Sequence, residues 1–195
     1  MNALARPAEI VAQVVPMTVE GLRILDEQGF FDNDNNKHEL IDGTLVMTPP
    51  PGGNHRLTER RTTKALFKAI ILKALDEAFS VQTGGAFQIG DKTLLGPDLV
   101  VLKETNAPTN PEASDVIIMV EIAWSSRERD LKTKAELYAG AGIQDYWVLD
   151  VPAKTVIVHR DPQEGIYQSV QAHRAPESIS SLREPSLQLA VADLF

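Results

Sequence analysis

Apolar residues recur at helical spacing over one long stretch of the chain, between Asn54 and Phe79. They stand three or four residues apart there, which places them along one side of an α-helix. The members of this row are Leu66, Phe67, Ile70, Ile71, Leu75, Ala78 and Phe79. An asparagine side chain caps the first turn of a helix well, so the pattern predicts a helix that begins at Asn54 and ends at about Phe79.

Two shorter segments are also expected to be helical. Leu22 and Leu25 share one helix face behind Thr18, a good N-cap residue, and Gly29 is a typical stop signal. A further helix is expected over residues 130–141, with Gly142 as its stop signal.

The remaining apolar runs are short and are bounded by turn residues, as is typical of β-strands. Asp42-Gly43 stands between two such runs and predicts a β-hairpin within residues 38–48. Residues 116–123 are apolar at every position except Glu121, which indicates a buried strand. Further strands are expected at 81–89, 98–103, 145–149, 155–159 and 166–172, with a loop at 105–114.

This order of elements predicts an α/β (α+β) fold. A mixed β-sheet is expected between two main helices, with an N-terminal helix and hairpin in front of it. The 195 residues, of which 43% are hydrophobic, supply enough material for one core. A single domain is therefore expected over residues 1–195, with residues 1–16 as a loosely ordered N-terminal segment.

Composition narrows the chemistry. The chain has no cysteine and only four histidines, which excludes disulfides, thiolate zinc sites and cysteine nucleophiles and leaves oxygen atoms as the expected metal ligands. Only 6% of the residues are aromatic, which argues against a sugar-binding groove of the glycosidase type. Neither a signal peptide nor a membrane span is apparent, so a cytoplasmic protein is expected.

The net charge of −8 argues against extensive non-specific electrostatic binding of nucleic acid. Basic residues nevertheless cluster in two places. One cluster lies on the predicted long helix and is interpreted as a solvated helix face in preference to a phosphate contact; the other follows Glu121. The members are Arg56, Arg60, Arg61, Lys64 and Lys68 in the first cluster, and Arg127, Arg129, Lys132 and Lys134 in the second.

Three charged residues carry the candidate chemistry. Asp98 follows Pro97 at the start of a predicted strand, Glu121 lies near the end of another, and Lys134 lies on the predicted helix, one turn before Tyr138. A buried carboxylate is costly unless a cation or hydrogen bonds compensate its charge, and a divalent metal ion supplies such a cation. Asp98, Glu121 and Tyr138 also have purely structural explanations, namely a turn, a salt bridge and a core position, but Asp98, Glu121 and Lys134 in this order favour a metal site.

In these motifs the chain resembles the Uma-type restriction endonuclease family of the PD-(D/E)XK nuclease superfamily. The resemblance extends over most of the sequence. Its segments are 17–20, 39–47 (Glu-Leu-Ile-Asp-Gly-Thr-Leu-Val-Met), 97–101, 121–123, 130–138, 142–150 and 189–195.

The resemblance implies an endonuclease that hydrolyses the phosphodiester bonds of DNA through a water activated by Mg²⁺, which Mn²⁺ can replace. It implies Asp98 and Glu121 as metal ligands, with the backbone carbonyl of Ile122 as a third. Lys134 is implied as the catalytic amine, which positions or deprotonates the attacking water and stabilises charge on the phosphate. Glu39 is implied to hold a metal-bound water or to orient the lysine.

The chain departs from the superfamily pattern in two places. The usual lysine stands two residues after the glutamate, where this chain has Ala123, so the amine must come from the helix. Lys132 competes with Lys134 for that role, but the two lie on different helix faces and only one can point inward. Trp124 stands where relatives commonly carry a small or acidic residue, which alters the mouth of the pocket. His55 either reaches the pocket or has a capping or surface role.

A second function is open to the same sequence: a catalytically inert module of the nuclease fold that binds nucleic acid or a partner protein. The acidic net charge and Ala123 favour it. The choice between DNA and RNA, the target sequence and the oligomeric state are left open, with a homodimer as the default for an enzyme that cuts both strands.

Overall fold

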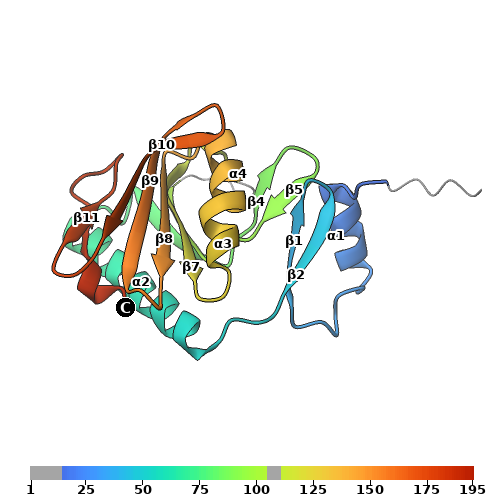
Figure 1. Cartoon of the computed structure of the whole chain (residues 1–195), viewed down its shortest axis with the longest axis horizontal. Coiled ribbons are helices and arrows are strands. Elements are labelled where there is room, and N and C mark those ends of the chain that lie inside the picture. Colours follow the sequence, from blue (N-terminus) through green and yellow to red (C-terminus); the bar gives the residue numbers. More distant parts are fainter. Residues whose placement is uncertain (1–14, 105–110) are drawn as a thin grey trace, which may run out of the picture.

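A six-stranded mixed β-sheet lies at the centre of the molecule (Figure 1). The computed structural model describes residues 15–104 and 111–195. The strand order is β10-β9-β8-β7-β6-β3; β7 and β8 pair in parallel and the other neighbours pair antiparallel. The strands are β3 (Phe79–Thr83), β6 (Leu99–Lys103), β7 (Val116–Ala123), β8 (Asp145–Asp150), β9 (Thr155–Gln163) and β10 (Ile166–His173).

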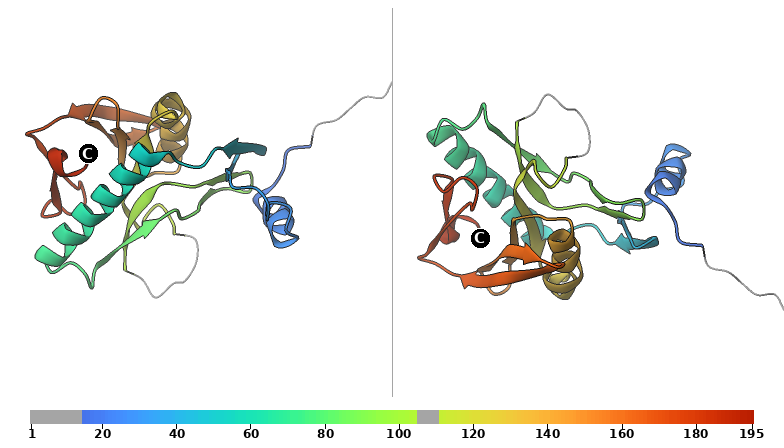
Figure 2. Two further views of the ribbon diagram at one scale, coloured as in Figure 1. Left: turned by 90° about the horizontal axis from the view of Figure 1, so that it is seen from below. Right: turned by 90° about the horizontal axis from the view of Figure 1, so that it is seen from above.

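Helices cover both faces of this sheet (Figure 2). One face carries the long helix α2 (Gly53–Leu72), the hairpin of β11 (Ser178–Ser180) and β12 (Gln188–Ala190), and a 3₁₀ turn, Val191–Asp193. The other face carries a continuous helical segment made of α3 (Arg127–Arg129), a π-helical turn (Asp130–Lys134) and α4 (Ala135–Gly140).

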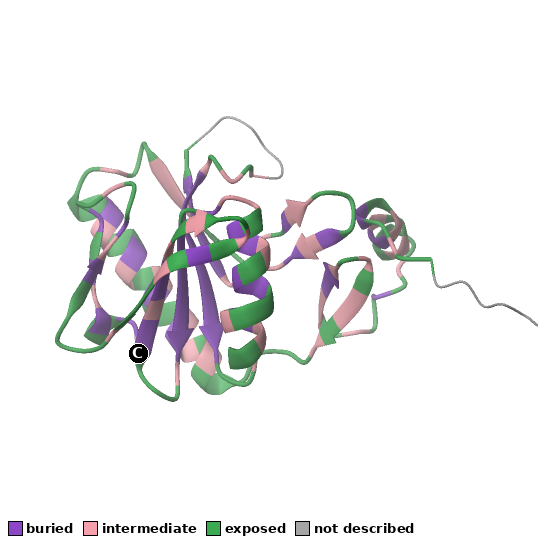
Figure 3. Ribbon diagram, turned by 45° about the horizontal axis from the view of Figure 1, so that its top comes forward, coloured by how far each residue is buried: buried purple, intermediate pink, exposed green. Residues whose placement is uncertain are grey.

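The alternation of β7 divides its side chains between these two layers. Val120 and Ile122 pack into the core beneath α2, whereas Met119 and Ala123 pack beneath α4. Every residue of β7 and β8 is buried, which is why the centre of the sheet is uniformly buried in Figure 3. Glu121 lies in phase with Met119 and Ala123 and therefore faces the α4 layer.

A second, four-stranded sheet stands beside the first, with α1 (Val19–Glu27) packed on it. Its strand order is β2-β1-β5-β4, and its own small core contains Val19, Leu22, Phe31 and Leu40. The strands are β1 (Lys37–Ile41), β2 (Thr44–Thr48), β4 (Phe87–Ile89) and β5 (Thr93–Leu95).

Most of the predicted elements are confirmed, and the long helix is corrected at both ends. Thr18 caps α1, the Asp42-Gly43 hairpin joins β1 to β2, and Gly142 follows the helical segment with φ +83°. Helix α2, however, begins at Gly53 after the N-cap Gly52, and it ends at Leu72. Ala74 has a left-handed backbone with φ +54°, which cannot continue a right-handed helix.

The predicted strand at 81–89 was also wrong as a single element. Gly84, with φ +64°, separates β3 from β4, and the two strands belong to different sheets. The helical segment begins at Arg127, three residues before its predicted start. Strands β5, β11 and β12 were missed because three residues are too few to show a period.

Residues 1–14 of the predicted N-terminal segment lie outside the described residues. Residues 105–110 of the predicted loop also lie outside them. Over residues 15–104 and 111–195, no helix has both the length and the hydrophobicity that a membrane span requires.

Candidate active site

Asp98, immediately before β6, stands opposite Glu121 on the neighbouring strand β7. The antiparallel register of β6 and β7 pairs Leu99 with Val120, so the next pair along is Asp98 with Glu121. Side chains in such a pair lie close together on the same face of the sheet. Asp98 also accepts a hydrogen bond of 2.7 Å from the backbone N–H of Ile122, which fixes its carboxylate against β7.

Glu121 is buried beneath the helical segment. Its Oε1 accepts hydrogen bonds from Lys134 Nζ at 2.8 Å and from the hydroxyl of Tyr138 at 2.9 Å. Lys134 and Tyr138 are four residues apart, so both reach the carboxylate from the same helix face. Burial raises the pKa of Glu121 to about 7, although the ammonium group of Lys134 acts in the opposite direction.

Lys134 connects the two sheets. Its side chain is only 1% exposed, and Nζ lies 2.8 Å from Oε1 of Glu121 and 2.8 Å from Oε1 of Glu39 on β1. Glu39 Oε1 also accepts a hydrogen bond from the backbone N–H of Gly96 at 2.8 Å. Burial by itself would lower the pKa of Lys134, but the carboxylates of Glu121 and Glu39 outweigh it and raise that pKa above its usual range.

Two further side chains bind Asp98 from outside the large sheet. Lys37 Nζ, from β1, lies 3.2 Å from Oδ1, and His55 Nε2, from the first turns of α2, lies 3.1 Å from Oδ2. Burial opposes ionisation of Asp98, but the hydrogen bond from His55 and the charge of Lys37 hold the pKa of Asp98 well below its usual range. Asp98 in turn raises the pKa of His55 against the effect of burial.

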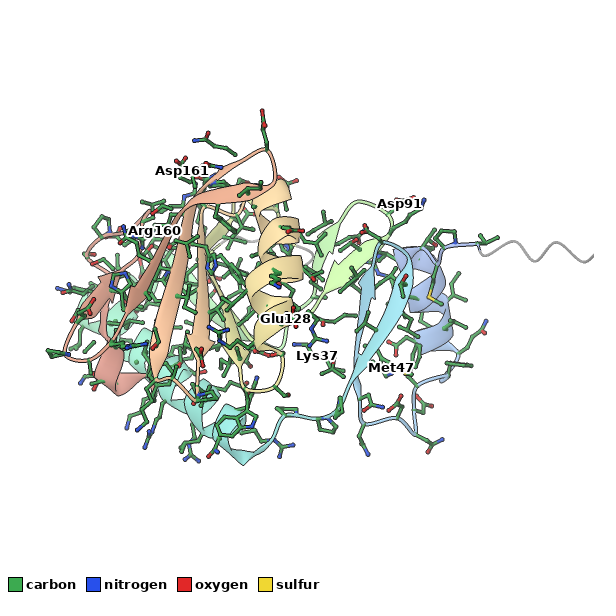
Figure 4. All side chains as sticks on the ribbon, in the orientation of Figure 1. Lys37, Met47, Asp91, Glu128, Arg160 and Asp161 are labelled. Carbon is green, nitrogen blue, oxygen red and sulfur yellow. The ribbon has the colours of Figure 1, made fainter. Side chains whose placement is uncertain are left out.

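Lys37, His55, Asp98, Glu121 and Lys134 line a pocket of about 160 Å³ between the two sheets. Figure 4 shows Lys37 pointing from β1 across this region toward the helical segment. Trp124, which is 48% exposed, lines the pocket as well. The full lining is Lys37, Thr48, Pro49, Pro50, Pro51, Gly52, His55, Asp98, Glu121, Trp124, Ser125, Ser126, Arg129, Asp130 and Lys134.

Asp130 adds a third carboxylate to the pocket wall. Its Oδ2 accepts a hydrogen bond from the Ser126 hydroxyl, whereas its Oδ1 is buried with no hydrogen-bond partner among the described residues. Asp130 opens the π-helical turn, and such turns frequently occur at functional sites. Burial raises the pKa of Asp130.

The donors of the pocket fit a hard divalent cation that keeps most of its waters. Within residues 15–104 and 111–195, no three His, Cys, Asp or Glu side chains form a ready-made metal cage. Mg²⁺ does not require one, because it commonly binds through one or two carboxylates and completes its octahedron with water. Asp98 and Glu121 would supply the two carboxylates, and the buried Oδ1 of Asp130, which has no hydrogen-bond partner among the described residues, would be an acceptor for such a water.

The structure brings together the four side chains that the sequence singled out, namely Glu39, Asp98, Glu121 and Lys134. Of the two rival lysines, Lys134 points inward. Lys132 is 70% exposed and pairs with Glu128 at 2.9 Å. Ile122 meets Asp98 through its N–H, and the role of its carbonyl as a metal ligand stays a prediction.

Sequence reasoning missed Lys37, named Arg129 only as a member of a basic cluster, and left His55 open. Lys37 precedes Glu39 by two residues on the same strand, so the period of a β-strand directs both side chains to the same face. That signal could have identified Lys37. The contact of His55 with Asp98 carried no local signal, because it depends on how α2 packs against the sheet.

A mixed sheet with opposed carboxylates on two neighbouring strands and a lysine on the covering helix defines a restriction-endonuclease-like nuclease fold. The chain belongs to the Uma2 family, described as "Putative restriction endonuclease", whose model matches residues 20–192.

Two solved structures show the extent of this likeness. "A putative nuclease belonging to DUF820" from Anabaena variabilis has a TM-score of 0.66 and 21% identity, over 81% of this chain and 89% of that one, so it has the same fold. The type IIG restriction endonuclease BpuSI overlaps only in part, with a TM-score of 0.38 and 16% identity over 57% of this chain and 12% of that one. No curated protein matches the chain.

Proposed function

We propose that the protein is a metal-dependent endonuclease that hydrolyses phosphodiester bonds of DNA. The observation that carries the proposal is the pair Asp98 and Glu121, opposed across β6 and β7 at the wall of a pocket. A bound Mg²⁺ or Mn²⁺ would supply the activated water and positive charge for the phosphate. Asp98 and Glu121 would hold this ion, with the carbonyl of Ile122 as a candidate third ligand.

The ammonium group of Lys37, 3.2 Å from Oδ1 of Asp98, would repel a cation bound there, so the proposed site requires Lys37 to move. The carboxylate oxygens of Asp98 are already bound by Lys37, His55 and the N–H of Ile122. Lys37 is the side chain best able to leave, because it is 32% exposed and has a flexible stem. In the proposed mechanism Lys37 turns from Asp98 to an oxygen of the scissile phosphate, and Arg129 provides a second positive charge on the same pocket.

Lys134 is assigned to positioning, not to proton abstraction. Its pKa is raised by two carboxylates, so it is an ammonium ion near neutral pH and has no lone pair for a proton. It holds Glu121 and Glu39 in place and offsets their charge. Glu39 is proposed to fix the position of Lys134, since its Oε1 is itself held by Gly96.

Cleavage of supercoiled plasmid DNA tests the proposal. Wild-type protein is expected to nick or linearise the plasmid with Mg²⁺ or Mn²⁺ and to lose this activity in EDTA. Glu121→Gln removes a proposed ligand charge at nearly constant volume and should lower the rate by on the order of 100-fold or more. Glu128→Gln, an exposed carboxylate near the same pocket, is the matched control and should cleave like wild type. Equal rates for both variants would reject the assignment.

The inert-module alternative draws support from Ala123 and from the contacts that Lys37, His55 and the N–H of Ile122 already make with Asp98. Calorimetric titration with Mn²⁺ separates the two functions. A nuclease site should bind the ion in wild type and lose it in Asp98→Asn, whereas an inert site should release no heat that depends on Asp98.

A further inference from the structure

Four cationic side chains form a row along the outer face of α2. Arg56, Arg60, Lys64 and Lys68 are four residues apart and all exposed. Residues at this spacing lie above one another on a helix. The opposite face of α2 has the same spacing and is buried against the core; its members are Thr58, Thr62, Leu66 and Ile70.

This row carries an electrostatic cost that the described fold offsets only in part, through Asp193, which lines a groove with Lys64 and Lys68. Among the described residues, none of the four cations is in an ion pair, and like charges four residues apart destabilise a helix. The neighbouring Arg61 is different, because its guanidinium binds the carbonyl of Phe195. The chain as a whole has a net charge of −8, so this row of positive charges, without ion pairs among the described residues, stands out from the rest of the molecule. It indicates a surface that binds an anionic partner.

The row begins at the candidate active site. Gly52 and His55 line the pocket, and Arg56 is the next residue of α2. From Arg56 to Lys68 the helix rises about 18 Å at 1.5 Å per residue. This length corresponds to about five steps of a DNA strand at 3.4 Å per step. At its far end, Lys64 and Lys68 line a groove together with Arg61 and Asp193.

We propose that the outer face of α2 binds the phosphate backbone of duplex DNA beside the scissile bond. The inference rests on the proposed nuclease function and extends it to the DNA flank. Charge complementarity and continuity with the pocket identify the partner. Figure 2 shows that α2 lies on the outside of the sheet along its whole length, so a duplex can reach it.

An anionic membrane fits this face less well. A membrane-surface helix needs an apolar face to insert, and the apolar face of α2 is used in the core. The exposed large apolar residues of α2, Phe67, Ile71 and Leu72, are confined to the C-terminal half of the helix.

The test compares two double variants that remove the same charge from the same residue type. K64Q/K68Q removes two of the four positive charges of the row. The control, K92Q/K103Q, removes two exposed lysines away from α2, one in a turn and one at the end of a strand. Binding to a fluorescein-labelled 30-base-pair duplex is measured by anisotropy in EDTA at several salt concentrations. K64Q/K68Q should bind about tenfold more weakly, and the slope of log K against log salt should be shallower by about 2. K92Q/K103Q should match wild type in both quantities.

Hydrolysis of bis(4-nitrophenyl) phosphate with Mn²⁺ separates this inference from the proposed function, because that substrate is too small to reach α2. If K64Q/K68Q loses DNA binding while wild type hydrolyses neither plasmid nor the small diester, the binding face stands and the nuclease proposal fails. If wild type is active but K64Q/K68Q keeps its affinity and salt slope, the inference is wrong. It is also wrong if wild type does not bind the duplex, or if the variant loses only binding to phosphatidylserine vesicles.

Discussion

Lys134 is the residue whose removal should disturb the molecule most. Its ammonium group is the shared partner of Glu39 and Glu121, both essentially buried. Lys134→Met keeps most of the side-chain volume but leaves two buried carboxylates without their cation. Removing one member of a buried ion pair costs about 3–5 kcal/mol, so the free energy of unfolding should fall by about that amount in urea titrations at pH 7.5.

A triple variant, E39Q/K134M/E121Q, is the control for this prediction. It removes all three charges together, so it should recover a large part of the lost stability. A Lys134→Met protein as stable as wild type would contradict the ion-pair explanation. A triple variant no more stable than the single one would indicate that packing, not charge, is the cause.

His159, which lies outside the candidate active site, should make the stability of the fold depend on pH. The ring is 4% exposed, lies 5.2 Å from Tyr146 and 5.6 Å from Tyr167 between ring centroids, and has an Nδ1 with no hydrogen-bond partner among the described residues. Burial lowers the pKa of His159 below 6.5. The unfolded chain therefore takes up the proton first as the pH falls, and stability that is present above pH 6.5 is lost below it.

The measurement is the melting temperature of wild type and His159→Gln at pH 7.5 and 5.5. Wild type should lose more on acidification than the variant, because the variant lacks the titrating ring. Other groups titrate equally in both proteins, so the difference between them isolates His159. An equal loss in the two proteins would contradict the prediction.

At the scale of elements, the end of α2 shows how backbone conformation overrides a hydrophobic pattern. Leu75 and Phe79 continue the helical spacing and do pack against the core, but from outside the helix. The left-handed Ala74, with φ +54°, turns the chain toward β3. The sequence carries no stop signal here, because the usual residue at a left-handed position is glycine and this position holds alanine.

Ala74 therefore offers a stabilising substitution. A left-handed conformation costs a non-glycine residue about 1–2 kcal/mol, so Ala74→Gly should leave the free energy of unfolding unchanged or raise it by up to about 1 kcal/mol. Ala65→Gly, in the middle of α2, should lower it by about 1 kcal/mol or more. Chemical denaturation of both variants gives the comparison. If both lose stability equally, the left-handed backbone of Ala74 is not the reason that α2 ends at Leu72.

At the scale of the whole molecule, local sequence patterns were enough to predict most helices and strands. The complete site could not be predicted in this way, because it forms only when these elements assemble. The order of Asp98, Glu121 and Lys134 was visible in the sequence because each lies at a recognisable position of a strand or helix. Lys37 and His55 come from the small sheet and from the face-packing helix α2, and they meet only at Asp98. The strand spacing from Glu39 could have marked Lys37 as a member of the site, but the contacts of Lys37 and His55 with Asp98 join elements far apart in the chain and leave no periodic trace.

The same assembly predicts that a divalent cation stabilises the entire fold. Ions that bind only the folded state raise its stability by about 2.7 kcal/mol at a hundredfold excess over Kd. In a chain of this size each kcal/mol corresponds to about 2–4 °C, so Mn²⁺ should raise the melting temperature by about 5–10 °C. The experiment is best done at pH 8, where Glu121, with a pKa of about 7, is mostly ionised.

Asp98→Asn and Glu121→Gln should abolish the shift, and Glu128→Gln should retain it. A shift that persists in Asp98→Asn would place the ion elsewhere. No shift in wild type would mean that Lys37 and His55 hold Asp98 more tightly than the ion can. Asp98 and its protein partners would then form a structural network, and the inert module would be the better description of this chain.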